Sequence, residues 1–251
     1  MKKFSFKSIL FTLFVVASLN SFGQQIDTIR VGHQFKNFDQ LSIGSMKYMI
    51  YAEREGIQRP SVLMNVKTER IEHEGKQYIA ITHVWNGFEK KFNGKFYSLV
   101  EPKTFKPVIH IRETEAKGKE AYKFSDKALT ALDTVSNNTE AGYKLELTEP
   151  IFNFEIDLET FSLLPLKKDY KAVLQFFHPG STFVGPDWYE IEVIGSEEIT
   201  LPGGEKLDTW ILFMDYNGTQ PTKFWYTKKG HEFIKMEGDY NGTKVRKVRM
   251  F

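Results

Sequence analysis

The last fifth of the chain, residues 206–251, has a pattern that is typical of consecutive β-hairpins. Four short runs rich in aromatic and β-branched residues alternate there with turn residues. Two of the junctions contain Asn-Gly, at Asn217 and Asn241, and a third contains Gly230 after a lysine. Asn and Gly tolerate the positive φ that tight hairpin turns need. The segment therefore predicts a four-stranded antiparallel meander, and we expect the rest of the chain to build on this sheet.

Further runs of strand character precede this meander. Aromatic residues make up 15% of the chain, which favours a pleated, half-buried surface and also allows an aromatic-lined cavity. Pro60 is expected to break the chain before the second run, and residues 24–41 are expected to join the sheet loosely. No linker is evident, so residues 24–251 are predicted to form one β-rich domain. The runs are residues 45–53, 61–72, 77–85, 90–100, 108–114, 121–124, 129–135, 143–148, 170–177 and 189–195.

One short helix is predicted after Pro150. Asn153 is a suitable N-cap, and Pro165 limits the helix because the residue before a proline avoids the α region. Apolar residues recur at helical spacing from Phe154 to Leu164. The fold class that follows is mainly β, a single large curved antiparallel sheet with one short covering helix.

Three carboxylates stand at the start of this helix, at Glu155, Asp157 and Glu159. They permit two interpretations: a metal or acid–base cluster, or negative charge that complements the helix dipole. In a continuous helix the first and last of them share a face and the middle one does not. Dipole complementation is therefore the favoured interpretation.

Residues 1–23 have the features of a secretory signal peptide. Lysines precede a short apolar run, and the small residues Ser21 and Gly23 stand at the −3 and −1 positions of a cut before Gln24. The apolar run is too short to span a membrane, and no later segment reaches that length. Loss of Lys2, Lys3 and Lys7 changes the formal charge from +2 to −1, which does not favour nucleic acid as a partner. We therefore expect export to the periplasm or the extracellular space.

Motifs for catalysis are absent from the sequence. The chain has no Cys, and its six His residues show no metal-ligand spacing. There is neither a nucleophile-elbow pattern nor a phosphate-binding Gly-rich loop. His178 begins the longest Pro/Gly-rich loop, residues 178–187, and is the strongest single candidate for a ligand contact. No metal or cofactor is predicted, and an enzyme is less favoured without being excluded.

Charged residues on two strands have simple structural interpretations. His110 and Arg112 alternate with Ile109 and Ile111, as expected for a solvated face and an apolar face. The last strand is basic, which suits an edge strand protected by charge. Its basic residues are Lys244, Arg246, Lys247 and Arg249.

Several stretches together resemble a family of exported bacterial proteins, the domain of unknown function numbered 3108, which is related in fold to periplasmic lipoprotein carriers of the LolA/LolB type. The departure is in the helix, where Ser162 or Leu163 stands at the place of an Arg that the family often has. The stretches that carry the resemblance are residues 97–107, 157–166, 193–197, 204–207 and 223–236.

The resemblance implies a half-open barrel whose concave face is covered by helix. The carriers hold acyl chains in that apolar cavity, and no catalytic residue transfers from the family. The first hypothesis is thus an exported, non-enzymatic protein of the cell envelope that binds an apolar or lipid-like ligand. The alternatives are a structural protein that docks an envelope partner through its sheet, and a hydrolase assembled from distant residues. The predicted ligand contacts are Trp85, Phe161, His178, Trp188, Trp210 and Trp225.

Overall fold

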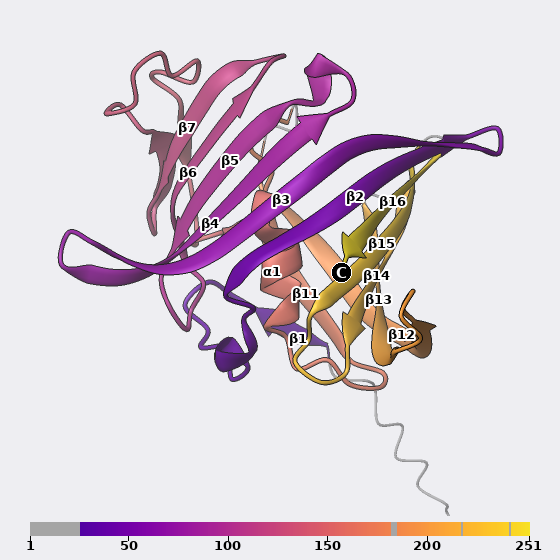
Figure 1. The fold of residues 1–251 in the computed structure, drawn as a ribbon. Helices are drawn as coiled ribbons and strands as arrows, with labels where there is room; N and C mark the ends of the chain where they lie inside the picture. Colours follow the sequence, from indigo (N-terminus) through magenta and orange to yellow (C-terminus); the bar gives the residue numbers. More distant parts are fainter. Residues whose placement is uncertain (1–25, 182–184, 217, 241) are drawn as a thin grey trace, which may run out of the picture.

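A computed structural model describes residues 26–181, 185–216, 218–240 and 242–251. Its strands form one open sheet in the order β1-β11-β12-β13-β14-β15-β16-β2-β3-β4-β5-β6-β7-β8-β9, and β10 pairs with β11 off this path (Figure 1). All pairings are antiparallel except those of β1 and β10 with β11, and the isolated bridge between Lys119 and Asn138. The prediction of a mainly β fold, with one large antiparallel sheet and one short helix, is confirmed.

The elements follow in chain order. The first group is β1 (Asp27–Ile29), η1 (Phe38–Gln40), β2 (Gly44–Arg54), β3 (Ile57–His73), β4 (Lys76–Gly87), η2 (Lys90–Phe92), β5 (Gly94–Val100), β6 (Pro107–Thr114), β7 (Gly118–Phe124), β8 (Ala128–Ala131) and β9 (Lys144–Glu146). The second group is β10 (Phe152–Asn153), η3 (Phe154–Ile156), α1 (Asp157–Ser162), β11 (Lys171–Phe177), β12 (Asp187–Thr200), β13 (Lys206–Tyr216), β14 (Gln220–Thr227), β15 (Phe233–Tyr240) and β16 (Thr243–Met250).

Two antiparallel meanders, β2 to β9 and β11 to β16, meet where β16 pairs with β2. The predicted meander near the C-terminus is confirmed as β13 to β16. The expectation that the last strand lies at an edge is wrong, because β16 is hydrogen-bonded on both sides. Its charges are instead distributed to the two faces of the sheet. Arg246, for example, donates to Glu53 on β2 at 2.6 Å.

Helix α1 lies against the concave face of the sheet, which wraps around it (Figure 1). Phe161 is fully buried there, with its ring 6.0 Å from that of Phe176 and 5.5 Å from that of Phe224, both edge-on. A helix of six residues is unstable alone, so this aromatic packing is what holds it. Asn153 caps the η3 turn through the N–H of Glu155, as predicted. The helical segment is otherwise a 3₁₀ turn followed by a single short α-helix.

The segment before β2 is packed rather than loosely held. Ile29 on β1 is buried where that strand pairs with β11, and Phe35, Phe38 and Leu41 are buried in the main core. Three large apolar side chains in seven residues bury enough surface to hold this segment against the sheet.

Pro60 does not break the chain, because β3 runs through it. The register between β2 and β3 shifts there, with Ile50 opposite Val62 but Tyr51 opposite Pro60. Such a bulge accommodates a residue that has no N–H to donate. Residues 90–92, predicted as strand, form the turn η2 instead.

Several sequence predictions fall outside the described residues: the signal peptide, the turn residues Asn217 and Asn241, and part of the loop after His178. Among the residues that are described, no helix is long and apolar enough to cross a membrane.

Candidate ligand-binding cavity

A cavity of about 330 Å³ lies on the concave face, beside the start of α1. Its wall combines side chains from η3 and α1 with side chains from the strands at the junction of the two meanders. Eleven of these are aliphatic or aromatic: Ile50, Val62, Met64, Trp85, Phe92, Phe154, Leu158, Tyr216, Met236, Tyr240 and Val245. The polar ones are Ser61, His83, Glu155, Asp157 and Lys247.

Strand alternation explains why these residues share one face. Successive side chains of a strand point to opposite faces, so Val62 and Met64 of β3 both face the cavity. On β16 the same rule turns Val245 and Lys247 inward, whereas Arg246 between them faces the other side and pairs with Glu53. A lysine of the internal strand is thereby placed in a largely apolar cavity.

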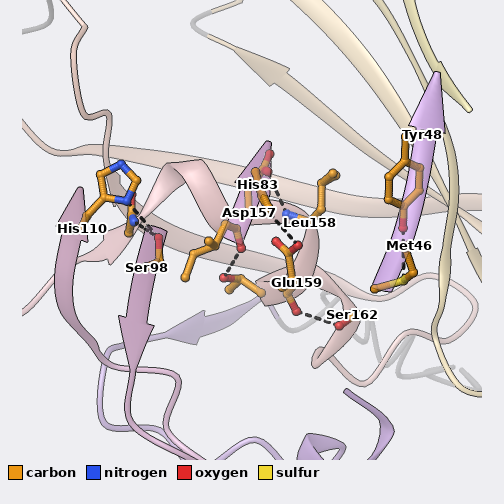
Figure 2. A network of polar contacts seen from close by, with 12 residues as sticks. Met46, Tyr48, His83, Ser98, His110, Asp157, Leu158, Glu159 and Ser162 are labelled. Atoms are coloured by element: carbon orange, nitrogen blue, oxygen red, sulfur yellow. Dashed lines mark hydrogen bonds and ion pairs between the residues drawn. The ribbon is translucent and has the colours of Figure 1, made fainter. Parts of the chain in front are cut away.

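The polar end of the cavity is organised around α1. Nε2 of His83 on β4 lies 3.0 Å from Oε1 of Glu159, and both side chains are almost completely buried (Figure 2). Asp157 accepts a hydrogen bond of 2.8 Å from the N–H of Leu158 and one of 3.4 Å from the hydroxyl of Tyr216. The carboxylates predicted only to complement a helix dipole therefore also have partners on the sheet.

The three carboxylates have different pKa values because their surroundings differ. Burial raises the pKa of Asp157 to about 7, although the charge of Lys247 opposes this shift. Burial likewise raises the pKa of Glu155. For Glu159 the effect of burial is outweighed by the charge and hydrogen bond of His83, so its pKa is lowered. Burial thus favours the neutral forms of Asp157 and Glu155, whereas His83 favours the ionised form of Glu159.

Among the polar side chains of the cavity wall, Lys247 carries the ammonium group. Burial lowers its pKa, and the nearby charges of Asp157, Glu159 and Glu155 oppose the shift. Over the described part of the chain, no carboxylate forms an ion pair or hydrogen bond with its ammonium. The ammonium and the carboxylates therefore interact across the cavity rather than by contact.

A second group of buried polar residues is formed by side chains of β5, β6 and β10. Ser98 Oγ is 2.9 Å from Nδ1 of His110 and accepts a hydrogen bond of 3.1 Å from the amide of Asn153 (Figure 2 labels the first two). The prediction that His110 and Arg112 form a solvated face is wrong, since His110 has no exposed surface. The cause is β10, which packs against the inner face of β6.

Only one of the six predicted contact residues lines the cavity. Trp85 does so, with its ring 5.2 Å from that of Phe96. Phe161, on α1, lies in the hydrophobic core and not on the cavity wall. His178 is stacked on Phe154 at 3.8 Å between ring centroids but is not part of the cavity wall. Burial lowers the pKa of His178 to about 4, and the charge of Asp187 opposes this.

The remaining three tryptophans lie elsewhere on the sheet. Trp188 is 43% exposed beneath the guanidinium of Arg30. Trp210 has Lys228 over its ring at 4.8 Å. Trp225 donates to Glu197 at 2.5 Å, and Lys235 lies 4.0 Å from its ring centroid.

His83, Lys247 and Met64 also line the cavity, and none of them was predicted as a ligand contact. A signal was present for His83, which is in phase with Ile79 and Ile81 on β4 and therefore faces the core. Within the described ranges, no group of three or more His, Asp or Glu side chains is arranged to hold a metal ion.

The comparison with protein families gives a clear result. The model of a family described as "Protein of unknown function (DUF3108)" matches residues 47–249. The chain belongs to this family. No curated protein matches the chain.

Solved structures show similarity in fold. A β-barrel-like protein of the domain of unknown function DUF1849 from Brucella abortus has a TM-score of 0.50 at 9% identity, covering 83% of this chain and 97% of its own. A DUF1329 family protein from Desulfovibrio piger has a TM-score of 0.28 at 10% identity, with 85% and 87% covered. The Mycobacterium tuberculosis lipoprotein LppX has a TM-score of 0.27 at 9% identity, with 85% and 91% covered. The Brucella protein shares the fold, and the two lower scores carry no argument.

Proposed function

We propose that this DUF3108 protein is an exported, non-enzymatic protein of the cell envelope that binds an apolar or lipid-like ligand in the cavity beside α1. The observation that carries the proposal is the cavity itself. Its volume of about 330 Å³ falls within the range of roughly 300–1,000 Å³ that is usual for small-molecule sites. Its wall is largely aliphatic and aromatic and carries a few polar side chains, as is usual for such sites.

Two features of the sequence support the cellular setting. The pattern of residues 1–23 is that of a secretory signal, and the resemblance to lipoprotein carriers implies an apolar cavity in a half-open barrel. Of the predicted contact residues, Trp85 is retained in this proposal because it lines the cavity.

Native mass spectrometry of the mature protein, purified from its own cell envelope and followed by organic extraction, tests the proposal. A bound amphiphile at one per chain is the expected result. Val245→Trp fills the cavity and should remove the amphiphile. The matched control is Val248→Trp, which places the same side chain on the opposite face of β16 and should retain it. A clean apo mass, together with no thermal shift on addition of fatty acids, fatty alcohols, fatty amines or phospholipids, would contradict ligand binding.

A second candidate function is docking of an envelope protein partner. A separate hollow of about 430 Å³ lies between the tip of the β2–β3 hairpin and η2. Around it Ile57 is 57% exposed and Phe88 65% exposed, and exposed apolar groups that cluster in this way are typical of interaction sites. Phe88→Asp should abolish binding of such a partner and leave the co-purified amphiphile unchanged. Loss of the amphiphile in this variant would argue against a separate docking role.

A further inference from the structure

We propose, on the basis of the ligand-binding function above, that the cavity selects amphiphiles whose polar end is a cationic amine, held by Glu155 and Asp157.

The ionisable side chains of the cavity wall carry no excess of positive charge. Two carboxylates, those of Glu155 and Asp157, and one ammonium, that of Lys247, line the cavity. When all three are ionised, one net negative charge remains. An anionic headgroup would add to this excess in a place where burial already penalises charge, whereas a cationic headgroup neutralises it.

Two of the carboxylates are available to accept hydrogen bonds from a ligand. Oε1 of Glu159 is engaged by His83 at 3.0 Å. Asp157 has one backbone hydrogen bond and one long contact of 3.4 Å to Tyr216, so its oxygens retain acceptor capacity. The carboxylate of Glu155 has no hydrogen bond or ion pair within the described residues, although it lines the cavity. Glu155 and Asp157 are thus the acceptors for an ammonium headgroup.

One buried atom without a partner lies next to the cavity wall. Oε2 of Glu159 accepts no hydrogen bond among the described residues, although the residue is only 9% exposed and its partner His83 lines the cavity. An unpaired buried carboxylate oxygen is costly, so it favours a headgroup that donates hydrogen bonds, as an ammonium does.

The aromatic wall favours the same headgroup. Trp85, Phe154, Tyr216 and Tyr240 line the cavity together with the carboxylates. Aromatic faces attract cations through the ring quadrupole, and a desolvated site strengthens this attraction. The alkyl chain packs against the aliphatic wall of the cavity, which includes Ile50, Val62 and Met64.

Titrations with decylamine, decanol and decanoate at low ionic strength test the proposal, because the three probes share a chain and differ only in the headgroup. The amine is expected to bind at least about tenfold more tightly than the alcohol, and the alcohol more tightly than the carboxylate. Glu155→Gln and Asp157→Asn should each reduce the preference for the amine over the alcohol several-fold. Glu190→Gln, at an exposed position on β12, is the matched control and should preserve the preference.

The outcomes separate this proposal from the one on which it rests. Decanoate binding as tightly as decylamine, or equal binding of all three probes, would overturn the headgroup selection while ligand binding stands. Binding of none of the probes would overturn both. Melting temperatures close to that of the parent protein would verify that the two neutral variants are folded.

Discussion

Nε2 of His83 lies 3.0 Å from Oε1 of Glu159, and this buried contact joins β4 of the first meander to helix α1. The two residues are 76 positions apart in the chain, so the contact is tertiary rather than part of a local turn. Removing one member of such a pair leaves an uncompensated group in a buried place, which costs more than the pair contributes.

His83→Leu should therefore lower the free energy of unfolding by about 3 kcal/mol, because Glu159 loses its partner. Urea unfolding would measure the loss. His73→Leu is the control, since His73 is half-exposed and lies 4.0 Å from the exposed Glu74. The double variant His83→Leu with Glu159→Leu should recover part of the loss. If the double variant instead loses the sum of the two single effects, the two residues are not coupled.

Asp157 predicts a dependence of stability on pH. Its pKa is about 7 in the folded protein and has a reference value of 3.8, so the folded state binds more protons between these values. The stability associated with Asp157 is therefore fully present below about pH 4 and is lost as the pH rises through 7.

Asp157→Asn removes this titration. Relative to the parent protein, the variant should gain stability progressively from pH 4 to pH 7.5, by an amount of order 1–2 kcal/mol after solvent screening. Thermal unfolding of both proteins across this range measures the difference. A constant difference at all pH values would show that Asp157 keeps an ordinary pKa.

The buried pair of Arg112 and Glu120 gives a further prediction about the stability of the protein. Its Nη1 donates to the carbonyl of Pro179 at 2.6 Å, and its Nε lies 3.4 Å from Oε2 of the buried Glu120. Arg112→Met should destabilise the protein by about 3 kcal/mol, and adding Glu120→Gln should restore part of this. Gly180→Ala should act in the same direction, since a Cβ there would lie 1.3 Å from Nη1 of Arg112 and Gly180 has a positive φ of 67°. Unfolding curves that match those of the parent protein would contradict the role of this pair.

The sequence predicted the fold well because its main signals are local. Turn residues and alternating apolar residues specify hairpins directly, so the strands from β11 to β16 follow from short stretches. The order of the sheet follows less directly, since β16 meets β2 only after the whole chain has returned. The charge on β16 therefore suggested an edge strand. The strand is instead internal, and Lys247 faces the cavity.

The candidate cavity depends on which face of a strand each side chain occupies, and local patterns indicate this less directly. Aromatic content alone does not say which face of a strand a tryptophan occupies. Trp85 is in phase with His83 and faces the cavity, whereas Trp225 lies between the inward-facing Phe224 and Tyr226. The polarity of His110 suggested solvent because β10 is too short to be recognised as the element that packs there, and Arg112 contacts Pro179, which is distant in sequence.

Fluorescence quenching by a terminally brominated decanol distinguishes the four tryptophans, since bromine quenches an indole that it contacts. Trp85 lines the cavity, while Trp188, Trp210 and Trp225 have their nearest charged partners outside it. The parent protein should show saturable quenching, and Trp85→Phe should lose it. Trp188→Phe, Trp210→Phe and Trp225→Phe should each keep it, because none of these rings adjoins the bound chain. Quenching that persists in Trp85→Phe and disappears in Trp225→Phe would place the ligand on the other face of the sheet and contradict the cavity as its site.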